Sequence, residues 1–499
     1  MSTCWEKNSD AIKQKNASLY LQLQNTVGND DYSEVIVSKT QKYVPIFKTG
    51  APLYSKYNPE KEFLQTFTET DTCVLFTGIA SCIHISLFLR KVPSCKCLLT
   101  EINLSSLKRL LELVDITEIL VNENVYLLPC IDDAHFTHAL AEQYLPVIDG
   151  NLRVFSLRSW ELFYKEKLPF VQKQIDTALA LVKQDFSTQA EFGKIWLKNI
   201  LKNLQVMAEK PLSIPICDTN KTALIVGAGP NLDKHLLTIK KERDSFVIFA
   251  AGTAFLPLVE AGIYPDFFLS IDPQVFSLYQ VTSLPKNCIG IFDLCTCSSL
   301  AHRFLKNTNE FFFTISNHPL CMYANTFVSI PFADTSSGTV AIYALDVAHR
   351  LGFSKIKTFA LDFCYSGGKP YPKGTWLSRQ IAQRSTHLFS TESFFSSIMF
   401  RSSIEVKQID GIYEYTSPLL LEYAKAFKQY TFDGKIWKHR FIEPFPYTAF
   451  EKTLIQEYLT EQKHAHMALL PFLAYCKKHK INFSHSLVID TILQYNYAL

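Results

Sequence analysis

The stretch 222-TALIVGAGPNLDKHLLTIK-240 decides the fold. It opens on the apolar run TALIV, which predicts a buried strand. The turn GAGPNL follows at 227–232, and a helix is expected directly after it. A strand, a glycine turn and a helix in this order are typical of a Rossmann-like parallel sheet.

Downstream of this stretch, apolar runs alternate with helical segments. Helices are expected over 255–261 and 338–351, and the expected strands are SFVIFAA, PDFFLSIDP, NCIGIFDL, EFFFTIS and KIKTFALDF. Strands in a sheet that is covered on both faces are apolar throughout, so these runs indicate a parallel sheet between two layers of helices. The fold class is therefore α/β.

A smaller unit of the same kind is expected upstream. The strand TCVLF ends at Gly78, and Glu101 lies 23 residues beyond it, where an acid binds the ribose in a dinucleotide-binding unit. The turn TGIAS holds only that one glycine, so we favour a degenerate packing module that kept the fold without the ligand. A nucleotide or methyl-donor site is the alternative.

These patterns divide the chain into five segments. A β-rich segment (1–70) precedes the degenerate Rossmann-like domain (71–145) and a helical connector (146–210) that ends before two prolines. The central Rossmann-like domain (211–405) is expected to carry the catalysis, and a helical region (406–499) follows it.

The charge balance excludes broad binding to polyanions. The chain has 50 Lys and Arg residues and 47 Asp and Glu residues, so its formal net charge is +3. Proteins that bind nucleic acid or anionic lipid non-specifically need a larger positive excess. We expect no nucleic-acid partner, and an anionic ligand must be held locally.

The cysteines and the amino terminus bear on the compartment. The close pairs Cys95/Cys97 and Cys295/Cys297 lack the C-x-x-C spacing of zinc or redox sites, so buried free thiols and no metal site are expected. The first residues lack the layout of a signal peptide, which favours a cytoplasmic location. The uncharged stretch 72–89 is rejected as a membrane span because polar residues and a glycine interrupt it.

Three strand ends carry residues suited to an anionic ligand. Backbone N–H groups at the start of a helix attract anions, and glycine lets the backbone approach them. Polar residues at the carboxyl ends of neighbouring parallel strands face one crevice. A tight structural turn and side-chain caps beside proline are the alternatives. The candidate residues from these strand ends are Gly227, Gly229, Pro230, Asn231, Gly252, Thr253 and Asp272.

Two later loops add hydroxyl groups. The segment TSSGT precedes a strongly apolar helix, and an N-cap would account for only one of its serines. The loop LDFCYSGGKPY carries two tyrosines whose phenols could stabilise a leaving phosphate, or could simply pack on each other. The candidate residues from these loops are Ser336, Ser337, Gly338, Asp362, Tyr365 and Tyr371.

In this order, GAGPNL, PDFFLSIDP, SSGTVAIYALDVAHRLG and ALDFCYSGGKPY resemble the central, MptE-like domain of the motility-associated factor (Maf) flagellin glycosyltransferases. That domain is also likened to an archaeal 6-hydroxymethylpterin diphosphokinase. Upstream, PLYSKYNPEKE is similar to a stretch of the Maf amino-terminal region, so the resemblance covers most of residues 45–400.

The stretch 336–371 also resembles bacterial CMP-sialic-acid-dependent sialyltransferases. By that resemblance Ser337 and Gly338 would hold CMP, and Tyr365 and Tyr371 would stabilise its departing phosphate. The implied activity is transfer of a pseudaminic- or legionaminic-type nonulosonic acid from its CMP ester to Ser or Thr of flagellin, with no cofactor or metal required. His387 is the candidate catalytic base, since it is the nearest downstream histidine.

Two other functions stay open. Pyrophosphoryl transfer from ATP to a hydroxymethylpterin would need Mg²⁺ held by carboxylates such as those of Asp272 and Asp362. A non-catalytic protein that binds or chaperones flagellin is the third reading, and the intact serine, glycine and tyrosine positions argue against it.

Overall fold

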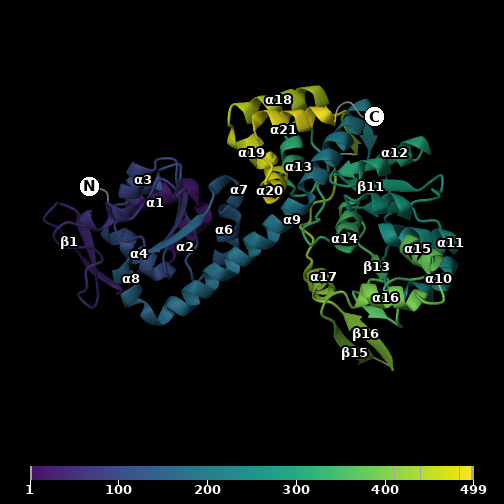
Figure 1. Cartoon of the computed structure of the whole chain (residues 1–499), viewed down its shortest axis with the longest axis horizontal. Coiled ribbons are helices and arrows are strands. Elements are labelled where there is room, and N and C mark those ends of the chain that lie inside the picture. Colours follow the sequence, from purple (N-terminus) through teal and green to yellow (C-terminus); the bar gives the residue numbers. More distant parts are fainter. Residues whose placement is uncertain (1–2, 410, 439, 483, 496–499) are drawn as a thin grey trace. The chain divides into compact units, whose positions relative to one another are not determined.

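The computed structural model describes residues 3–409, 411–438, 440–482 and 484–495. The chain divides into two compact units, Met1–Thr188 and Gln189–Leu499. The division falls inside the long helix α9 (Leu168–Glu209), shown in blue in Figure 1. The helix ends where the helical connector was expected to end, but the compact carboxy-terminal unit begins earlier than the predicted boundary at 210.

The amino-terminal unit is built on a parallel four-stranded sheet in the order β5-β4-β3-β6. Its strands are β3 (Cys73–Thr77), β4 (Lys96–Thr100), β5 (Val125–Leu127) and β6 (Leu152–Ser156). The Rossmann-like alternation expected for this region is present. Strand β6 lies in the segment expected to be helical; it is a half-buried edge strand, so it lacks the continuous apolar run that marks the inner strands.

Around this sheet lie α1 (Cys4–Lys15), α2 (Ala17–Gln24), α3 (Ile83–Lys91), α4 (Leu104–Leu113), α5 (Thr117–Leu120), α6 (Phe136–Gln143), α7 (Pro146–Asp149) and α8 (Arg158–Phe163), with the hairpin β1 (Tyr32–Val37) and β2 (Tyr43–Phe47). The first 70 residues therefore open on two helices, which differs from the β-rich segment expected. A capping box starts α1, in which the Thr3 hydroxyl accepts from the Glu6 N–H and the Glu6 carboxylate accepts from the Thr3 N–H.

The carboxy-terminal unit is built on a parallel six-stranded sheet in the order β12-β11-β10-β9-β8-β13. The strands are β8 (Thr222–Val226), β9 (Phe246–Ala251), β10 (Phe267–Ser270), β11 (Ile289–Asp293), β12 (Phe311–Thr314) and β13 (Ile356–Phe359). The five strands β8 to β12 are almost wholly buried, as their apolar runs predict, whereas the edge strand β13 is half-exposed. This is the predicted Rossmann-like domain.

Helix α14 (Val340–Arg350) packs against β8, β9 and β10. The other helices of this unit are α10 (Leu232–Lys241), α11 (Phe255–Glu260), α12 (Ser298–Lys306), α13 (Pro319–Ala324), α15 (Trp376–Arg384), α16 (Thr391–Met399), α17 (Pro418–Gln429), α18 (Tyr447–Leu459), α19 (Lys463–Ala468), α20 (Leu470–Lys478) and α21 (His485–Gln494). In Figure 1 the yellow helices α18 to α21 form one bundle, and α19 contacts α13.

The region after 405 is not helical throughout. Strands β15 (Glu405–Ile409) and β16 (Ile412–Thr416) form an exposed hairpin that joins β14 (Tyr365–Ser366) in a three-stranded sheet. A short antiparallel pair, β7 (Leu212–Ser213) with β17 (Phe441–Ile442), ties the late chain to the start of the domain. Because β15 lies in water on both faces, it lacks the alternating pattern by which strands are recognised.

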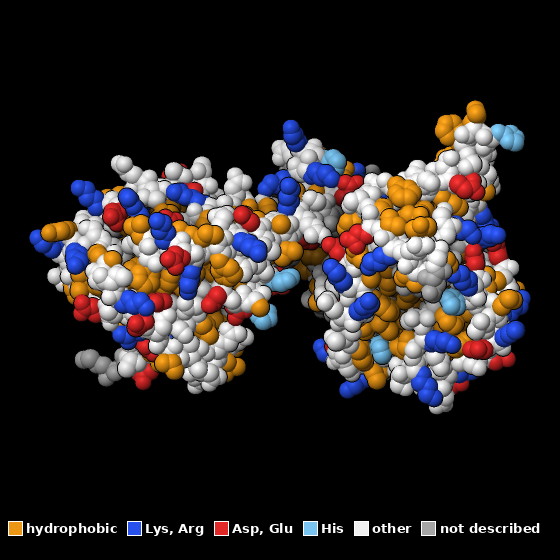
Figure 2. Space-filling view, turned by 90° about the horizontal axis from the view of Figure 1, so that it is seen from below, with side chains coloured by type: hydrophobic (Ala, Val, Ile, Leu, Met, Phe, Trp, Pro, Cys, Tyr) orange, Lys and Arg blue, Asp and Glu red, His pale blue; other side chains and the backbone are white. Residues whose placement is uncertain are grey.

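Lysine and arginine side chains are interspersed with acidic ones over the face shown in Figure 2, which fits the small net charge. Among the residues that the structure describes, no helix combines the length and apolar character needed to cross a membrane.

Candidate active site

The order of the central sheet singles out the junction of β8 and β13. The chain runs outward from β8 to β12 and then returns to place β13 on the other side of β8. Ligands of open parallel sheets bind outside the carboxyl ends of the strands where the order reverses. Val226 pairs with Phe359, so the turn after β8 and the loop after β13 begin side by side.

The two glycines of the GAGPNL turn make room for the neighbouring loop. The Gly229 N–H donates to the Ala360 carbonyl at 2.8 Å. A Cβ on Gly227 would lie 2.5 Å from that carbonyl oxygen, and a Cβ on Gly229 would lie 2.4 Å from Oδ2 of Asp362. Both distances are too short for a side chain, so close packing of the two loops requires both glycines.

The start of α10 already holds a carboxylate. The Asn231 N–H donates to Oδ2 of Asp362 at 2.9 Å. The helix begins at Leu232 with Asn231 as its cap, so Pro230 lies in the turn before the helix. A phosphate at this helix N-terminus would have to displace Asp362 or share its donors.

Gln280 covers the end of β9. Its Nε2 donates to the Thr253 hydroxyl at 3.1 Å, and a Cβ on Gly252 would lie 2.2 Å from its Oε1. Gln280 ends the short helix η5 (Val275–Gln280) and was not foreseen, because nothing in its local sequence marks it.

Asp272 lies two residues beyond β10 and caps a turn. Its Oδ1 accepts from the Gln274 N–H at 2.8 Å, which is the alternative expectation of a side-chain cap beside proline. Burial raises the pKa of Asp272, although the bond from Gln274 opposes the rise. The backbone carbonyl of Asp272 accepts from Cys297, after β11, so this residue is tied to the far side of the sheet from Asp362.

The turn that contains Ser336, Ser337 and Gly338 precedes α14. Helix α14 begins at Val340 with Thr339 as its cap, two residues later than expected, and the Gly338 N–H donates to the Thr335 carbonyl at 2.9 Å. Gly338 has φ +69°, which glycine adopts without strain. The Ser337 hydroxyl is buried and has no hydrogen-bond partner among the described residues, so it is available to a ligand.

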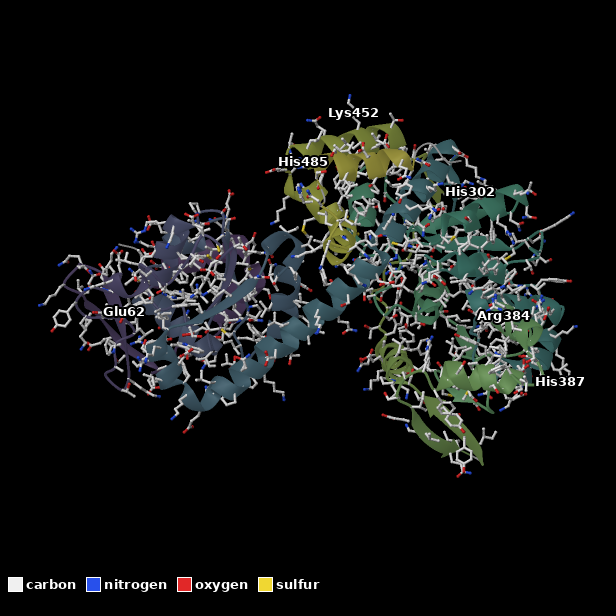
Figure 3. All side chains as sticks on the ribbon, in the orientation of Figure 1. Glu62, His302, Arg384, His387, Lys452 and His485 are labelled. Atoms are coloured by element: carbon white, nitrogen blue, oxygen red, sulfur yellow. The ribbon has the colours of Figure 1, made fainter. Side chains whose placement is uncertain are left out.

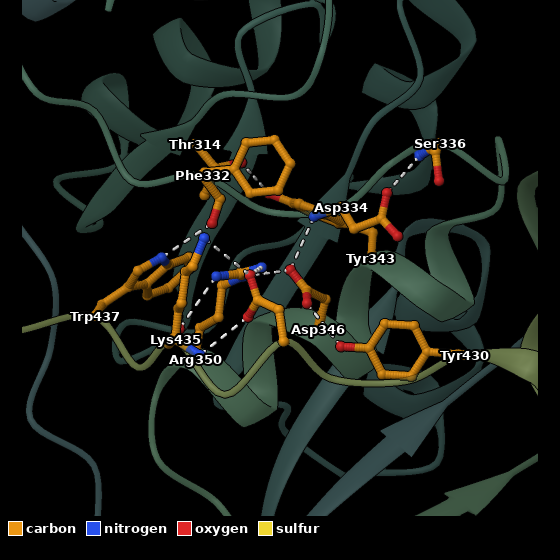
Figure 4. Close-up of polar contacts among 11 residues, drawn as sticks. Thr314, Phe332, Asp334, Ser336, Tyr343, Asp346, Arg350, Tyr430, Lys435 and Trp437 are labelled. Carbon is orange, nitrogen blue, oxygen red and sulfur yellow. Dashed lines mark hydrogen bonds and ion pairs between the residues drawn. The ribbon is translucent and has the colours of Figure 1, made fainter. Parts of the chain in front are cut away.

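A buried ion pair anchors this turn (Figure 4). Oδ2 of Asp346 accepts from Nε of Arg350 and from the Asp334 N–H at 2.8 Å, and Oδ1 of Asp334 in turn accepts from the Ser336 N–H at 2.8 Å. Oδ1 of Asp346 accepts from the Tyr430 hydroxyl at 2.7 Å. Because Asp346 and Arg350 are both nearly inaccessible to water, this pair fixes the turn firmly to α14.

The two predicted tyrosines lie near each other. Tyr365 is buried on β14, where it pairs with Tyr415 of the hairpin. Burial raises the pKa of Tyr371, the Tyr365 phenol raises it further, and the guanidinium of Arg401 opposes the rise. A raised pKa keeps the Tyr371 phenol protonated, so it can donate a hydrogen bond at neutral pH.

Tyr423 of α17 connects the tyrosines to the serine turn. It contributes to the raised pKa of Tyr371, and its hydroxyl lies 3.9 Å from the position that a Cβ on Gly338 would take. Burial raises the pKa of Tyr423 as well. The sequence around it, LLLEYAKAF, shows only an ordinary amphipathic helix, and Arg401 carries no signal either, so neither residue was foreseen.

His387 lies apart from these groups. It is exposed in the turn between α15 and α16, and Figure 3 shows it at the periphery of the unit. It makes no hydrogen bond or ion pair with any described residue. Its assignment as catalytic base remains a prediction.

In the amino-terminal unit, an indole ring fills the place above the glycine turn. A Cβ on Gly78 would lie 2.4 Å from Cδ1 of Trp160, and Nε1 of Trp160 donates to Oε2 of Glu101 at 2.9 Å. The Tyr32 hydroxyl also donates to Glu101, whose side chain is fully buried. Glu101 is therefore not available to a ribose, which agrees with the favoured reading of a packing module.

Comparison with known proteins places these features in a family. The family model described as "6-hydroxymethylpterin diphosphokinase MptE-like" matches residues 197–368, which include the GAGPNL turn and the serine turn. An uncharacterized protein of Treponema pallidum (strain Nichols) is 32% identical over 270 residues, 52% of this chain and 96% of its own length. A second is 36% identical over 178 residues, 35% of this chain and 85% of its own length.

The structure is similar to that of the Maf glycosyltransferase from Magnetospirillum magneticum AMB-1. The match has a TM-score of 0.54 and 12% identity, and it covers 99% of this chain and 94% of the other. At that identity the likeness shows a shared fold. The chain belongs to the family of the Treponema pallidum proteins, carries an MptE-like region over residues 197–368, and shares its fold with the Maf glycosyltransferase.

Proposed function

We propose that this protein is a glycosyltransferase that moves a nonulosonic acid of the pseudaminic or legionaminic type from its CMP ester to Ser or Thr hydroxyls of flagellin. The observation that carries the proposal is the gathering of the Ser337 turn, Tyr365, Tyr371 and Tyr423 at the carboxyl edge of the central sheet. The solved protein that shares this fold is named a glycosyltransferase, which supports the same class of reaction.

The reaction separates charge at the bond between the anomeric carbon and the phosphate oxygen. That bond breaks with its electron pair on the phosphate, the acceptor hydroxyl oxygen bonds to the anomeric carbon, and the hydroxyl proton passes to a base. The phenols of Tyr365, Tyr371 and Tyr423 can donate hydrogen bonds to the phosphate as its charge grows, and removal of one such donor typically costs about 2.7–4 kcal/mol of transition-state stabilisation. Arg401 adds a positive charge close to Tyr371.

Backbone N–H groups are less available to bind the donor phosphate than the sequence suggested. The Asn231 N–H is bonded to Asp362, and the Gly338 N–H is bonded within its own turn. We therefore assign binding of the donor phosphate chiefly to the Ser337 hydroxyl, and stabilisation of the departing phosphate to the phenols. His387 stays the candidate base for the acceptor hydroxyl.

Pyrophosphoryl transfer from ATP is the second candidate, because the matching family model is described as diphosphokinase-like. It would need carboxylates that share Mg²⁺, whose oxygen ligands lie about 2.0–2.1 Å from the ion. Asp272 follows β10 and Asp362 follows β13, and two strands stand between them. At about 4.8 Å per strand the two strand ends are about 14 Å apart, so these two carboxylates do not suit one ion.

Ligand-dependent melting distinguishes the two activities. A ligand present at 100 times its dissociation constant stabilises the folded state by about 2.7 kcal/mol. For the unit Gln189–Leu499 that corresponds to a rise in Tm of about 4 °C. We expect CMP and CTP to produce this rise and ATP with Mg²⁺ to produce none. Stabilisation by ATP with Mg²⁺ alone would refute the glycosyltransferase proposal.

Transfer itself is tested by the intact mass of flagellin incubated with the CMP-activated sugar and the protein. The Tyr365→Phe, Tyr371→Phe double variant should lose transfer and keep CMP binding. Tyr413→Phe, on the exposed hairpin, is the matched control and should transfer normally. Full modification by the double variant would remove the phenols from the mechanism. Stable binding of flagellin by the wild-type protein, with no change in flagellin mass when the sugar donor is present, would favour the chaperone alternative.

A further inference from the structure

Three metal-ligating side chains meet at the carboxyl ends of β11 and β12, away from the candidate active site. They are Cys295, His318 and Cys321, and one ligand atom from each lies within 4.8 Å of the others. Both cysteines are buried. Cys295 follows β11, whereas His318 and Cys321 stand at the start of α13, so the group joins two neighbouring strand ends.

The distance between the sulfurs fits a shared metal ion. The Sγ atoms of Cys295 and Cys321 are 3.9 Å apart. Two thiolates on a tetrahedral zinc ion, each about 2.3 Å from the metal, lie about 3.8 Å from each other. A disulfide would bring them to about 2.05 Å.

Unpartnered polar atoms surround the group. Nε2 of His318 and Oδ2 of Asp293 are buried and have no hydrogen-bond partner among the described residues. Asp293 is only 2% exposed, and its carboxylate also contacts the side chain of Cys295. Buried polar atoms are nearly always satisfied in folded proteins, so two at one place point to a missing partner.

Hydrogen bonds fix the loop that carries Cys295 without any bound ion. Nδ2 of Asn199 donates to the Cys295 carbonyl at 3.1 Å, and Nδ2 of Asn203 donates to the carbonyls of Leu294 and Thr296, each at 2.9 Å. The Cys295 N–H donates to Oδ1 of Asp293 at 2.8 Å. Such outer contacts typically orient the ligands of a metal site.

We propose that Cys295, Cys321 and His318 bind a zinc-class divalent cation, with Asp293 as the nearest candidate for a fourth ligand. The two thiolates and the neutral imidazole balance the charge of the ion before Asp293 joins, which lowers the cost of burying it. Binding through Nε2 places the ring proton of His318 on Nδ1 and opens the 3.2 Å contact that Nδ1 now accepts from the Leu320 N–H. The ion would lock the β11 and β12 ends together, independently of the proposed glycosyl transfer.

Metal analysis of the purified full chain tests the site. We expect about one zinc ion per chain by elemental analysis after purification without chelators. Cobalt(II) added to the reduced, metal-stripped protein should give the strong absorption of tetrahedral thiolate coordination. His318→Ala and Cys321→Ser should abolish both signals, and Cys297→Ser, a buried cysteine next to the group, is the matched control and should keep them.

The wild-type cobalt titration does not depend on whether a variant folds. Absence of zinc together with absence of the cobalt signal in the reduced wild type would overturn the proposal. Recovery of a Cys295–Cys321 disulfide as the resting form, shown by mass spectrometry without reductant, would also overturn it.

Discussion

Replacing Asp346 by alanine tests whether the serine turn depends on the buried ion pair. The substitution removes the partner of Arg350, which is only 4% exposed, and the acceptor of the Asp334 N–H. Removing one partner of a buried pair costs about 3–5 kcal/mol because the other charge is left buried. In this variant Arg350 still donates to the Lys435 carbonyl at 3.1 Å and to the Asp433 carboxylate at 3.4 Å. We therefore expect a loss of folding stability at the lower end of that range, about 3 kcal/mol.

Hydrogen exchange read by mass spectrometry locates this loss. Peptides that cover 334–350 should exchange about 100-fold faster in the Asp346→Ala variant, since each 1.4 kcal/mol is a factor of ten. Peptides of the amino-terminal sheet should be unchanged. CMP binding should weaken in parallel, because the turn that presents Ser337 loses its anchor.

Asp433→Ala is the matched control, since it removes the exposed partner of the same guanidinium. Exposed pairs contribute about 0–1 kcal/mol, so this variant should stay close to the wild type. Asp346→Asn keeps the shape of the side chain and most of its hydrogen bonds. Its exchange rate over 334–350 should therefore lie between those of Asp346→Ala and Asp433→Ala. This variant replaces Asp346→Ala in the test if the alanine variant does not fold. Equal exchange in Asp346→Ala and Asp433→Ala would refute the reasoning.

Three further predictions concern single side chains. Burial raises the pKa of Glu101 to about 7 from an ordinary 4.5, so the folded state keeps a proton that the unfolded state releases. The stability of the amino-terminal unit should therefore fall by up to about 3 kcal/mol as pH rises from about 4.5 to 7, and urea unfolding of Glu101→Gln should show no such fall. Tyr423→Phe should slow transfer about 10²-fold or more with little change in Tm, and an unchanged rate would exclude Tyr423 from the site. Gly229→Ala should cost about 1–3 kcal/mol in thermal unfolding, because its Cβ would overlap Asp362; an unchanged Tm would contradict the loop packing.

Local sequence was sufficient to predict most strands of the two parallel sheets and the loops that carry the candidate site. Apolar runs marked the inner strands of both sheets, because a strand buried on both faces has no polar positions. The same rule failed at β6 and β15, which lie at edges and are partly or wholly exposed. The β13 edge was still predicted, because the segment KIKTFALDF that contains it carries enough apolar residues to indicate a strand.

Roles were harder to predict than positions. Gly227 and Gly229 were interpreted as openings for a ligand, and they also admit the Ala360 and Asp362 loop. The close cysteine pairs lack the C-x-x-C spacing, and the spacing His318-x-x-Cys321 gives no metal-site signal until the distant Cys295 joins it in the fold. The role of the two glycines and the role of the cysteines each depend on a contacting residue that lies far away along the chain.

By itself, the sequence determined the α/β class, the central parallel sheet and the motifs at its strand ends, because these depend on hydrophobic period and turn chemistry within a few residues. Only the tertiary structure decided which groups meet. It placed Trp160 over Gly78, Asp362 on the start of α10, and Tyr423 beside the serine turn. Contacts of this kind join residues tens of positions apart, and their neighbours in the chain carry no trace of them.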